Sequence, residues 1–235
     1  MVLAAGAGSR MGGLTRDLPK PMLEVAGAPI LGHILRNLAR HGFTQVVLNL
    51  HHCGEAIAAH CGDGSRYGVR LAYLREDRLL GTAGAVKNAQ AHLAGAEPFL
   101  VHYGDVLTAQ DLGALLAAHR QSGARATLLL HRRAGSNSMV AMDGGRRITG
   151  LLERPTAAQR AGVDAPWVNS GVYLLDPAVL DAIPPGAPCD FPRDVFPGLI
   201  AGGRVFGHPL TGYRCAVDSP ERLEQARREF PGAEK

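Results

Sequence analysis

The sequence predicts an α/β fold built on a doubly wound, mainly parallel sheet. Short apolar runs of strand length alternate with segments whose apolar residues have helical spacing. Residues 45–50 form a continuous apolar run, as expected of a strand that a parallel sheet buries on both faces. The chain also opens with an apolar run that stops at a glycine-rich turn, which is typical of the first strand of such folds.

The elements follow from these patterns in chain order. The predicted strands are residues 2–3, 45–50, 69–74, 98–106, 126–131, 148–155, 167–173 and 205–208, the last stopped by Pro209. The predicted helices are residues 30–41, 54–60, 81–93, 112–119 and 221–230. Residues 143–147 predict a hairpin turn. Because a buried first strand usually runs about five residues, either this strand is short or residues upstream of Met1 are missing.

Composition narrows the class of protein. The chain has 235 residues, of which 46% are hydrophobic and 20% charged, as in ordinary globular proteins. It has no apolar run long enough for a membrane span and no secretory signal, so we expect a cytoplasmic protein. The net charge of +4 suits small anionic substrates, and without a dense run of Lys and Arg it does not indicate nucleic acid.

The four cysteines are Cys53, Cys61, Cys189 and Cys215. They form no C-x-x-C pair, and the histidines near the first two match no familiar zinc module. We therefore expect reduced thiols and no structural zinc.

The opening turn has the chemistry of a polyphosphate site. Gly6 and Gly8 let backbone N–H groups approach an anion without a Cβ in the way. Arg10 offers a planar, permanent charge, and the prolines on both sides of Lys20 restrict its backbone. A dinucleotide fingerprint would need glycine where Met11 stands, and no Gly-Lys-Ser/Thr motif is present, so the two commonest nucleotide loops are disfavoured.

The opening pattern resembles the signature of the sugar-1-phosphate nucleotidyltransferases, or NDP-sugar pyrophosphorylases. It runs from Leu3-Ala4-Ala5-Gly6-Ala7-Gly8-Ser9-Arg10-Met11 through Leu14-Thr15 to Pro19-Lys20-Pro21-Met22-Leu23. The resemblance extends over nearly the whole chain. It implies a Rossmann-like, GT-A-like catalytic domain over residues 1–235, with a nucleotide-binding half of about 1–110 and a sugar-binding half of about 111–235. Gly12-Gly13 depart from the Arg/Lys-Pro usual in the family.

The resemblance implies transfer of a nucleotidyl group from a nucleoside triphosphate to a sugar 1-phosphate, with release of pyrophosphate. Residues 81–85 are most similar to those of guanylyltransferases, so we expect GTP with mannose or manno-heptose 1-phosphate. Uridylyl or thymidylyl transfer to another hexose 1-phosphate stays open, as does a non-catalytic sugar-nucleotide-binding relative. A dinucleotide-dependent oxidoreductase is a more distant alternative. No nucleic acid or membrane partner is expected, and a homo-oligomer is compatible with the family.

The resemblance also assigns site residues, with Arg10 and Lys20 as the catalytic ones. The nucleotide-binding residues are Leu3, Ala4, Ala5, Gly6, Ala7, Gly8, Ser9, Gly81, Thr82 and Gly84. The sugar-phosphate-binding residues are Tyr103, Gly104, Glu153, Arg154, Asn169 and Gly171, where Arg154 replaces the usual lysine of a Glu-Lys-Pro element. Each has a plainer alternative: the glycines of 81–85 could serve helix packing, and Asn169 could be a buried amide satisfied by backbone groups.

The expected cofactor is Mg²⁺, which one or two carboxylates and substrate phosphates commonly hold. Asp105 follows a buried strand at the position of the family's metal-binding aspartate, although it could instead cap the next helix. Alignment of Ser219-Pro220-Glu221 with the family puts Ala216 where the second metal-binding aspartate is usual. Asp218 lies two residues further on. Since alternate residues of a strand share a face, it is the candidate substitute.

Overall fold

A computed structural model describes residues 1–6, 8–16, 18–93, 95, 97–133, 136–161 and 163–232. The chain forms two compact units. Unit 1 comprises Met1–Leu79, His102–Leu112 and Thr211–Lys235, and unit 2 comprises Leu80–Val101 and Gly113–Leu210. The C-terminal segment thus belongs to the same unit as the opening turn. The nucleotidyltransferase domain with halves at 1–110 and 111–235 stays a prediction.

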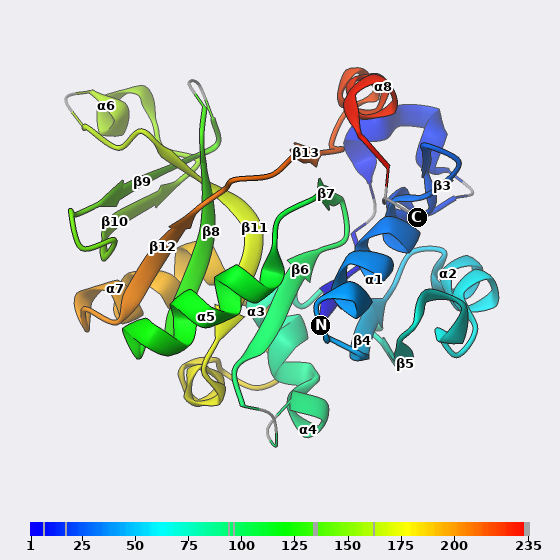
Figure 1. The fold of residues 1–235 in the computed structure, drawn as a ribbon, viewed down its shortest axis with the longest axis horizontal. Coiled ribbons are helices and arrows are strands. Elements are labelled where there is room, and N and C mark those ends of the chain that lie inside the picture. The colour runs from blue at the N-terminus through cyan, green and yellow to red at the C-terminus, as the bar shows by residue number, and fades with distance from the viewer. Residues whose placement is uncertain are drawn as a thin grey trace. The chain divides into compact units, whose positions relative to one another are not determined.

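Unit 1 contains a parallel sheet. β1 (Val2–Leu3) pairs in parallel with β4 (Gln45–Leu50) on one side and with the end of β6 (Phe99–Tyr103) on the other. β4 pairs in parallel with β5 (Arg70–Arg75). The connections are α1 (Ile30–Arg40) and α2 (Gly54–Cys61), drawn in blue and cyan beside these strands in Figure 1. The predicted strand–helix order is confirmed here, and the ends of β4, β5, α1 and α2 differ from the prediction by at most one residue. The single strand predicted over residues 98–106 is wrong, because a turn at residues 104–105 ends β6 at Tyr103 and Val106 begins another strand.

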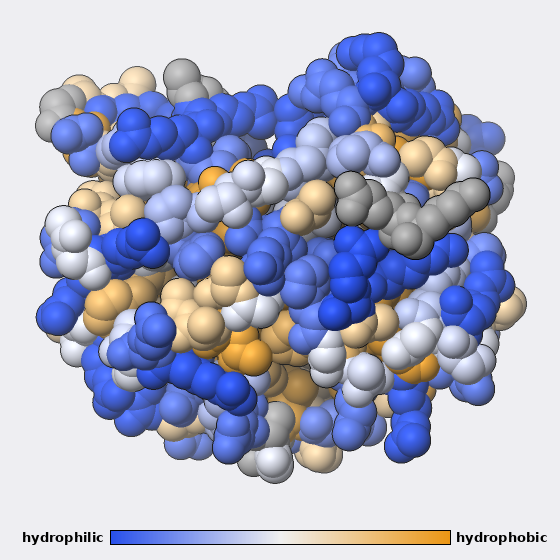
Figure 2. Space-filling view, viewed as in Figure 1, coloured by the Kyte–Doolittle hydropathy of each residue, from blue (hydrophilic) through white to orange (hydrophobic). Residues whose placement is uncertain are grey.

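Two small antiparallel pairs complete unit 1. β2 (Glu24–Val25) pairs with β3 (Ala28–Pro29), and β7 (Val106–Thr108) pairs with β13 (Arg214–Ala216). The last helix, α8 (Pro220–Glu229), buries Leu223 and Ala226, and the rest of it is mainly charged. Its surface is accordingly hydrophilic (Figure 2).

Unit 2 is built on a mixed sheet. β8 (Ala126–Arg132) pairs antiparallel with β11 (Trp167–Leu175) and parallel with β12 (Val205–Pro209). β9 (Ser138–Met142) pairs with β10 (Ile148–Glu153) across the predicted hairpin turn, and also with β11. The predicted end of the last strand at His208 is wrong by one residue. Pro209 still pairs in register with Leu130, because an edge strand tolerates a proline.

The helices of unit 2 are α3 (Gly81–Asn88), α4 (Gln90–Leu93), α6 (Ala157–Arg160) and α7 (Phe196–Ala201), and α5 (Leu112–Ser122) begins at its boundary. The single helix predicted over 81–93 is therefore two helices, because Ala89 leaves helical geometry at φ −85° and ψ 5°. Tyr173, Phe191 and Phe196 are fully buried and pack edge-to-face or stacked at centroid distances of 5.0–5.8 Å. Along the described part of the chain, none of the helices combines the length and apolar character that crossing a bilayer requires.

Candidate active site

The opening turn of unit 1 is held by its own backbone. Gly8 adopts φ +64°, a conformation that favours glycine, and its carbonyl accepts hydrogen bonds from Met11 N–H at 2.8 Å and the Thr15 hydroxyl at 3.1 Å. A Cβ at Gly6 would meet nothing within 4 Å, so the space beside it is open to a ligand. A 3-10 helix begins at Ser9, and Ala7 lies outside the described residues.

A buried polar network fixes the end of β1. The backbone N–H of Ala4 donates to Asn49 Oδ1 at 2.8 Å, and Asn49 Nδ2 donates to Glu76 Oε1 at 2.9 Å. Both side chains are buried, at 4% and 6% exposure. This pair is not among the predicted site residues, since Asn49 stands inside an apolar run. The only available signal was a polar residue at a position where a parallel sheet buries both faces.

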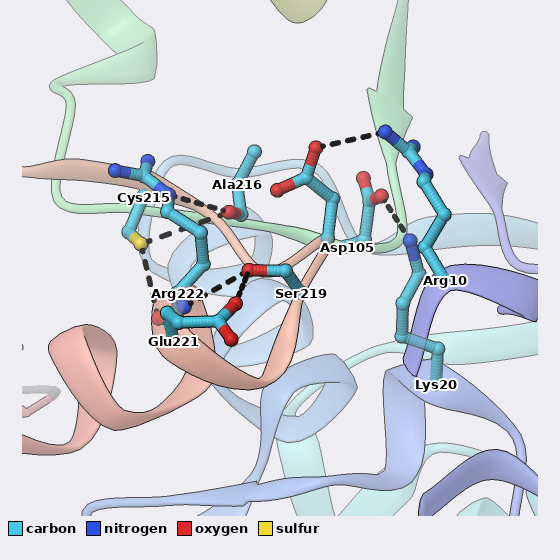
Figure 3. A network of polar contacts seen from close by, with 9 residues as sticks. Arg10, Lys20, Asp105, Cys215, Ala216, Ser219, Glu221 and Arg222 are labelled. Carbon is cyan, nitrogen blue, oxygen red and sulfur yellow. Dashed lines mark hydrogen bonds and ion pairs between the residues drawn. The ribbon is translucent and has the colours of Figure 1, made fainter. Parts of the chain in front are cut away.

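The two predicted catalytic cations each pair with a predicted metal-binding carboxylate. Lys20, in a short 3-10 turn over Lys20–Met22, donates from Nζ to Asp105 Oδ2, and both side chains are partly buried. Arg10 Nη1 lies 3.2 Å from Asp218 Oδ2, and its side chain is 61% exposed. Figure 3 shows the Lys20 side chain pointing at Asp105, with the Arg10 side chain next to it. The structure thus brings together four predicted residues from three distant segments.

Asp218 is not on a strand, so the same-face argument for it is wrong. β13 ends at Ala216, which pairs in register with Val106, and Asp218 precedes α8. The backbone still places it near Asp105, because Val217 N–H donates to the Asp105 carbonyl at 2.8 Å. Ala216 itself supplies only its carbonyl, which accepts from Arg222 Nε at 3.2 Å (Figure 3). Asp218 therefore reaches the candidate site from a loop, through its ion pair with Arg10.

Gly104 has a structural reason to be glycine. A Cβ there would lie 2.6 Å from the Leu3 carbonyl oxygen, which already accepts from Gly104 N–H at 2.9 Å. Its neighbour Tyr103 is half-buried, and its carbonyl pairs with His102 Nδ1 at 2.8 Å. Contact of either residue with a sugar phosphate stays a prediction.

The predicted base-binding segment opens α3 in unit 2. Gly81 has φ +72°, and a Cβ on it would lie 2.6 Å from the Cys189 carbonyl oxygen. That carbonyl accepts from the N–H groups of Ala83 and Gly84 at 2.9 and 3.0 Å. The packing explanation for these glycines therefore holds in the structure, while their contact with a base stays a prediction.

Asp190 stabilises the same helix start. Its Oδ1 accepts from the Thr82 N–H at 3.0 Å and the Thr82 hydroxyl at 3.2 Å, and its Oδ2 pairs with Arg193 at 2.5 Å. Burial opposes ionisation of this carboxyl, but the hydrogen bonds from Thr82 and Arg193 outweigh it and hold its pKa below the ordinary value. Asp190 is not among the predicted site residues. The hydrogen bond between Asp190 and Thr82 could not be predicted from the sequence, because the two residues are 108 positions apart.

The predicted sugar-binding residues of unit 2 lie at the end of β10 and within β11. Glu153 ends β10 half-buried, and burial raises the pKa of its carboxyl although Arg154 and Arg193 oppose the rise. Arg154 follows it with φ +51° and an exposed side chain. On β11, Asn169 Nδ2 donates to the Tyr173 hydroxyl at 2.7 Å, and Asn169 Oδ1 accepts from Gly171 N–H at 3.0 Å. Among the described residues, these are its side-chain amide's hydrogen bonds, which leaves one N–H and one lone pair for a ligand.

The comparisons with known proteins settle the family. Residues 1–211 match the family model described as nucleotidyl transferase. The chain belongs to this family. It is 36% identical over 227 residues to the N-acetylmuramate alpha-1-phosphate uridylyltransferase of Neisseria meningitidis serogroup B, covering 96% of this chain and 95% of the relative.

A second relative is a longer protein. The chain is 34% identical over 227 residues to the mannose-1-phosphate guanylyltransferase of Mycobacterium tuberculosis, covering 94% of this chain but only 61% of that relative. A Bacillus anthracis protein crystallised with sucrose, provisionally named a glucose-1-phosphate thymidylyltransferase, superposes with a TM-score of 0.86. The match covers 99% of this chain and 96% of the other at 19% identity, and it confirms the α/β fold class.

Proposed function

We propose that this protein transfers a nucleotidyl group from a nucleoside triphosphate to a sugar 1-phosphate and releases pyrophosphate. The observation that carries the proposal is the pairing of Lys20 with Asp105 and of Arg10 with Asp218 beside the glycine turn of unit 1. This part of unit 1 thus contains two cations suited to phosphate oxygens and two carboxylates suited to a divalent metal. Family membership supports the same reaction class.

The chemistry needs no protein nucleophile. An oxygen of the sugar phosphate attacks the α-phosphorus of the triphosphate, a new P–O bond forms, and the bond to the β-phosphate oxygen breaks as pyrophosphate leaves. Arg10 and the backbone N–H groups of the turn bind the triphosphate in this proposal. Lys20 neutralises the negative charge that moves onto the leaving pyrophosphate. Its ammonium is partly buried, and electrostatic interactions are stronger there than in water.

The donor set fits a magnesium ion. Asp105 and Asp218 offer carboxylate oxygens, the ligands that Mg²⁺ prefers, and the substrate phosphates would complete the coordination. When bound, the ion supplies Lewis-acid polarisation and charge neutralisation at the phosphates. In the structure, Lys20 and Arg10 pair with these carboxylates. Binding of substrate therefore exchanges cation–carboxylate pairs for cation–phosphate pairs.

Two nucleotide and sugar pairs are candidates. Residues 81–85 and the Mycobacterium tuberculosis relative support GTP with mannose or manno-heptose 1-phosphate. The Neisseria meningitidis relative, whose length this chain almost fully covers, supports uridylyl transfer to an amino-sugar acid 1-phosphate. Because both reactions consume a nucleoside triphosphate, we place the protein in the cytoplasm.

Pyrophosphate release tests the proposal. The protein with Mg²⁺ is assayed with each of GTP, UTP, dTTP, CTP and ATP against a panel of sugar 1-phosphates. We expect release with one pair well above all others. Silence across the panel, with nucleotide binding still measurable, would instead favour the non-catalytic relative that the residue Ala216 suggests.

A further inference from the structure

Unit 2 contains a basic pocket that the proposed reaction does not yet use. Its volume is about 390 Å³, within the range of small-ligand sites. Arg132, Arg133 and Arg160 contribute to its lining together with Ser136 and Ser138, and none of the lining residues that the structure describes is acidic. A pocket with this lining would favour an anionic ligand.

Among the described residues, the three guanidinium groups have no carboxylate partner. Arg160 donates to the backbone carbonyls of Ser136 and Pro155, at 2.7 and 3.3 Å. The Arg132 guanidinium lies 4.7 Å from the centre of the Trp167 ring, and Arg133 is exposed. Within the described ranges, none of the three arginines forms an ion pair. Three uncompensated charges around one pocket repel one another, and a bound anion would remove that repulsion.

The pocket adjoins the predicted sugar-binding residues. Ser138, which lines the pocket, accepts a hydrogen bond from the Asn169 N–H at 3.0 Å. Ser138 also stands opposite Glu153 in the β9–β10 register. Directly opposed residues of antiparallel strands share a face of the sheet. The pocket and the predicted sugar site therefore meet at Ser138.

The strand register extends this shared face to the arginines. Trp167 stands opposite Arg132 on β8 and opposite Val140 on β9. Asn169, two residues along β11, is on the same side of the strand as Trp167. A sugar held at Asn169 and Glu153 would consequently have one edge toward the guanidinium of Arg132.

We propose that the pocket binds a carboxylate carried by the sugar, so that the acceptor is an acid-bearing sugar 1-phosphate. The inference rests on the proposed function. The phosphate at the sugar's C1 must reach the triphosphate, so a second anionic group is needed to compensate the arginines. A carboxylate accepts two parallel hydrogen bonds from one guanidinium group in a bidentate pair. A neutral hexose 1-phosphate would leave all three charges uncompensated.

The first test compares two acceptors that differ by one acidic arm. N-acetylmuramate 1-phosphate carries a lactyl carboxylate that N-acetylglucosamine 1-phosphate lacks. We expect kcat/KM to be roughly 10- to 100-fold higher for the acid. This ratio corresponds to the free energy that one charge-assisted hydrogen bond contributes. Equal values, or a preference for the neutral sugar, would overturn the inference while leaving nucleotidyl transfer intact.

The variant Arg133→Gln tests the pocket itself, because Arg133 is exposed and its loss removes charge without a buried contact. We expect it to lower the ratio of acid to neutral kcat/KM by about 10-fold. The matched control is Arg228→Gln on the exposed face of α8, which should leave the ratio unchanged. A ratio that Arg133→Gln leaves unchanged contradicts the pocket assignment.

Fluorescence separates this inference from the proposed function. Trp167 is the single tryptophan of the chain and lies under Arg132, so its emission reports on the pocket without turnover. We expect N-acetylmuramate 1-phosphate to change the emission at a concentration at least 10-fold lower than N-acetylglucosamine 1-phosphate or inorganic phosphate. Similar midpoints for all three ligands would overturn the inference. If no pyrophosphate is released with any pair, the proposed function fails, and this titration still decides the pocket.

Discussion

The ammonium group of Lys20 donates a hydrogen bond to the carboxylate of Asp105, a residue 85 positions later in the chain. The Lys20 side chain is 12% exposed and the Asp105 side chain 23% exposed, so the pair is only partly screened by water. Lys20 is held there by a short turn between Pro19 and Pro21, and Asp105 follows the parallel strand β6. A predicted catalytic cation and a predicted metal ligand therefore face each other directly.

Lys20→Ala should lower kcat/KM for nucleotidyl transfer by roughly 100- to 1,000-fold, because it removes a partly buried charge that stabilises developing negative charge. Arg10→Ala should act in the same direction. Thermal unfolding should show that both variants fold, with Arg228→Gln as the charge-matched control. Wild-type turnover in both variants would exclude the assigned roles.

Asp105→Asn should raise the Mg²⁺ concentration needed for half-maximal rate and lower the maximal rate at least 10-fold, since the amide is a poorer ligand. Asp218→Asn should do the same to a smaller degree, because its partner Arg10 is largely exposed. Asp181→Asn, an exposed site in unit 2, is the control. If Asp218→Asn shows an unchanged Mg²⁺ dependence, Asp218 does not replace the acid that the family carries at the position of Ala216.

Asp190→Ala should lower the free energy of unfolding by about 1–3 kcal/mol, since it removes two hydrogen bonds to Thr82 and the pairing with Arg193. Asp190→Asn keeps an acceptor oxygen and should cost less. Urea unfolding measures both changes, with Asp181→Asn again as control. Equal stability of wild type and Asp190→Ala would show that the start of α3 does not depend on this carboxylate.

Because His102 is buried, we expect the folded protein to lose stability in mild acid. Burial lowers its pKa to about 4, although the hydrogen bond to the Tyr103 carbonyl opposes the shift. Because the folded pKa lies below the unfolded value of about 6.5, the unfolded chain binds more protons between these values. Stability is then complete above about pH 6.5 and falls as the pH drops toward 4, by up to about 3 kcal/mol.

Urea unfolding at pH 5 and pH 7.5 measures this dependence. His102→Gln should show a smaller difference in unfolding free energy between the two pH values than wild type. His92→Gln, at an exposed position, should behave as wild type. A wild-type difference in His102→Gln would assign the acid sensitivity to other groups.

Local patterns were sufficient to predict most of the fold. The run at residues 45–50 coincides with β4, and the helical spacing from Ile30 gave α1 to within a residue. These features depend on neighbours in sequence, so periodicity carries them. The break at Ala89 and the extra strand residue Pro209 were missed, because backbone geometry and strand pairing decide them.

The candidate site was predictable where motif residues are close in sequence and less so where tertiary contacts set it. Arg10 and Lys20 could be chosen from the opening pattern, but their partners are set by tertiary structure. Asp218 lies in the loop between β13 and α8, and Asp105 lies in the turn between β6 and β7. Asn49 carried no motif, and its hydrogen bond to Ala4 follows only from the β1–β4 pairing. The basic pocket combines residues from two separate segments of the chain, 132–139 and 160–166, which no local pattern connects.

The most direct test of the account follows the α-phosphorus. The protein, Mg²⁺ and a sugar 1-phosphate are incubated with a nucleoside triphosphate that is radiolabelled at its α-phosphate, and the products are separated. The account predicts that the label appears in a compound that also contains the sugar, in a 1:1 ratio with released pyrophosphate. Label found only in free nucleoside monophosphate or diphosphate would contradict it, because the triphosphate would then be hydrolysed rather than transferred to the sugar.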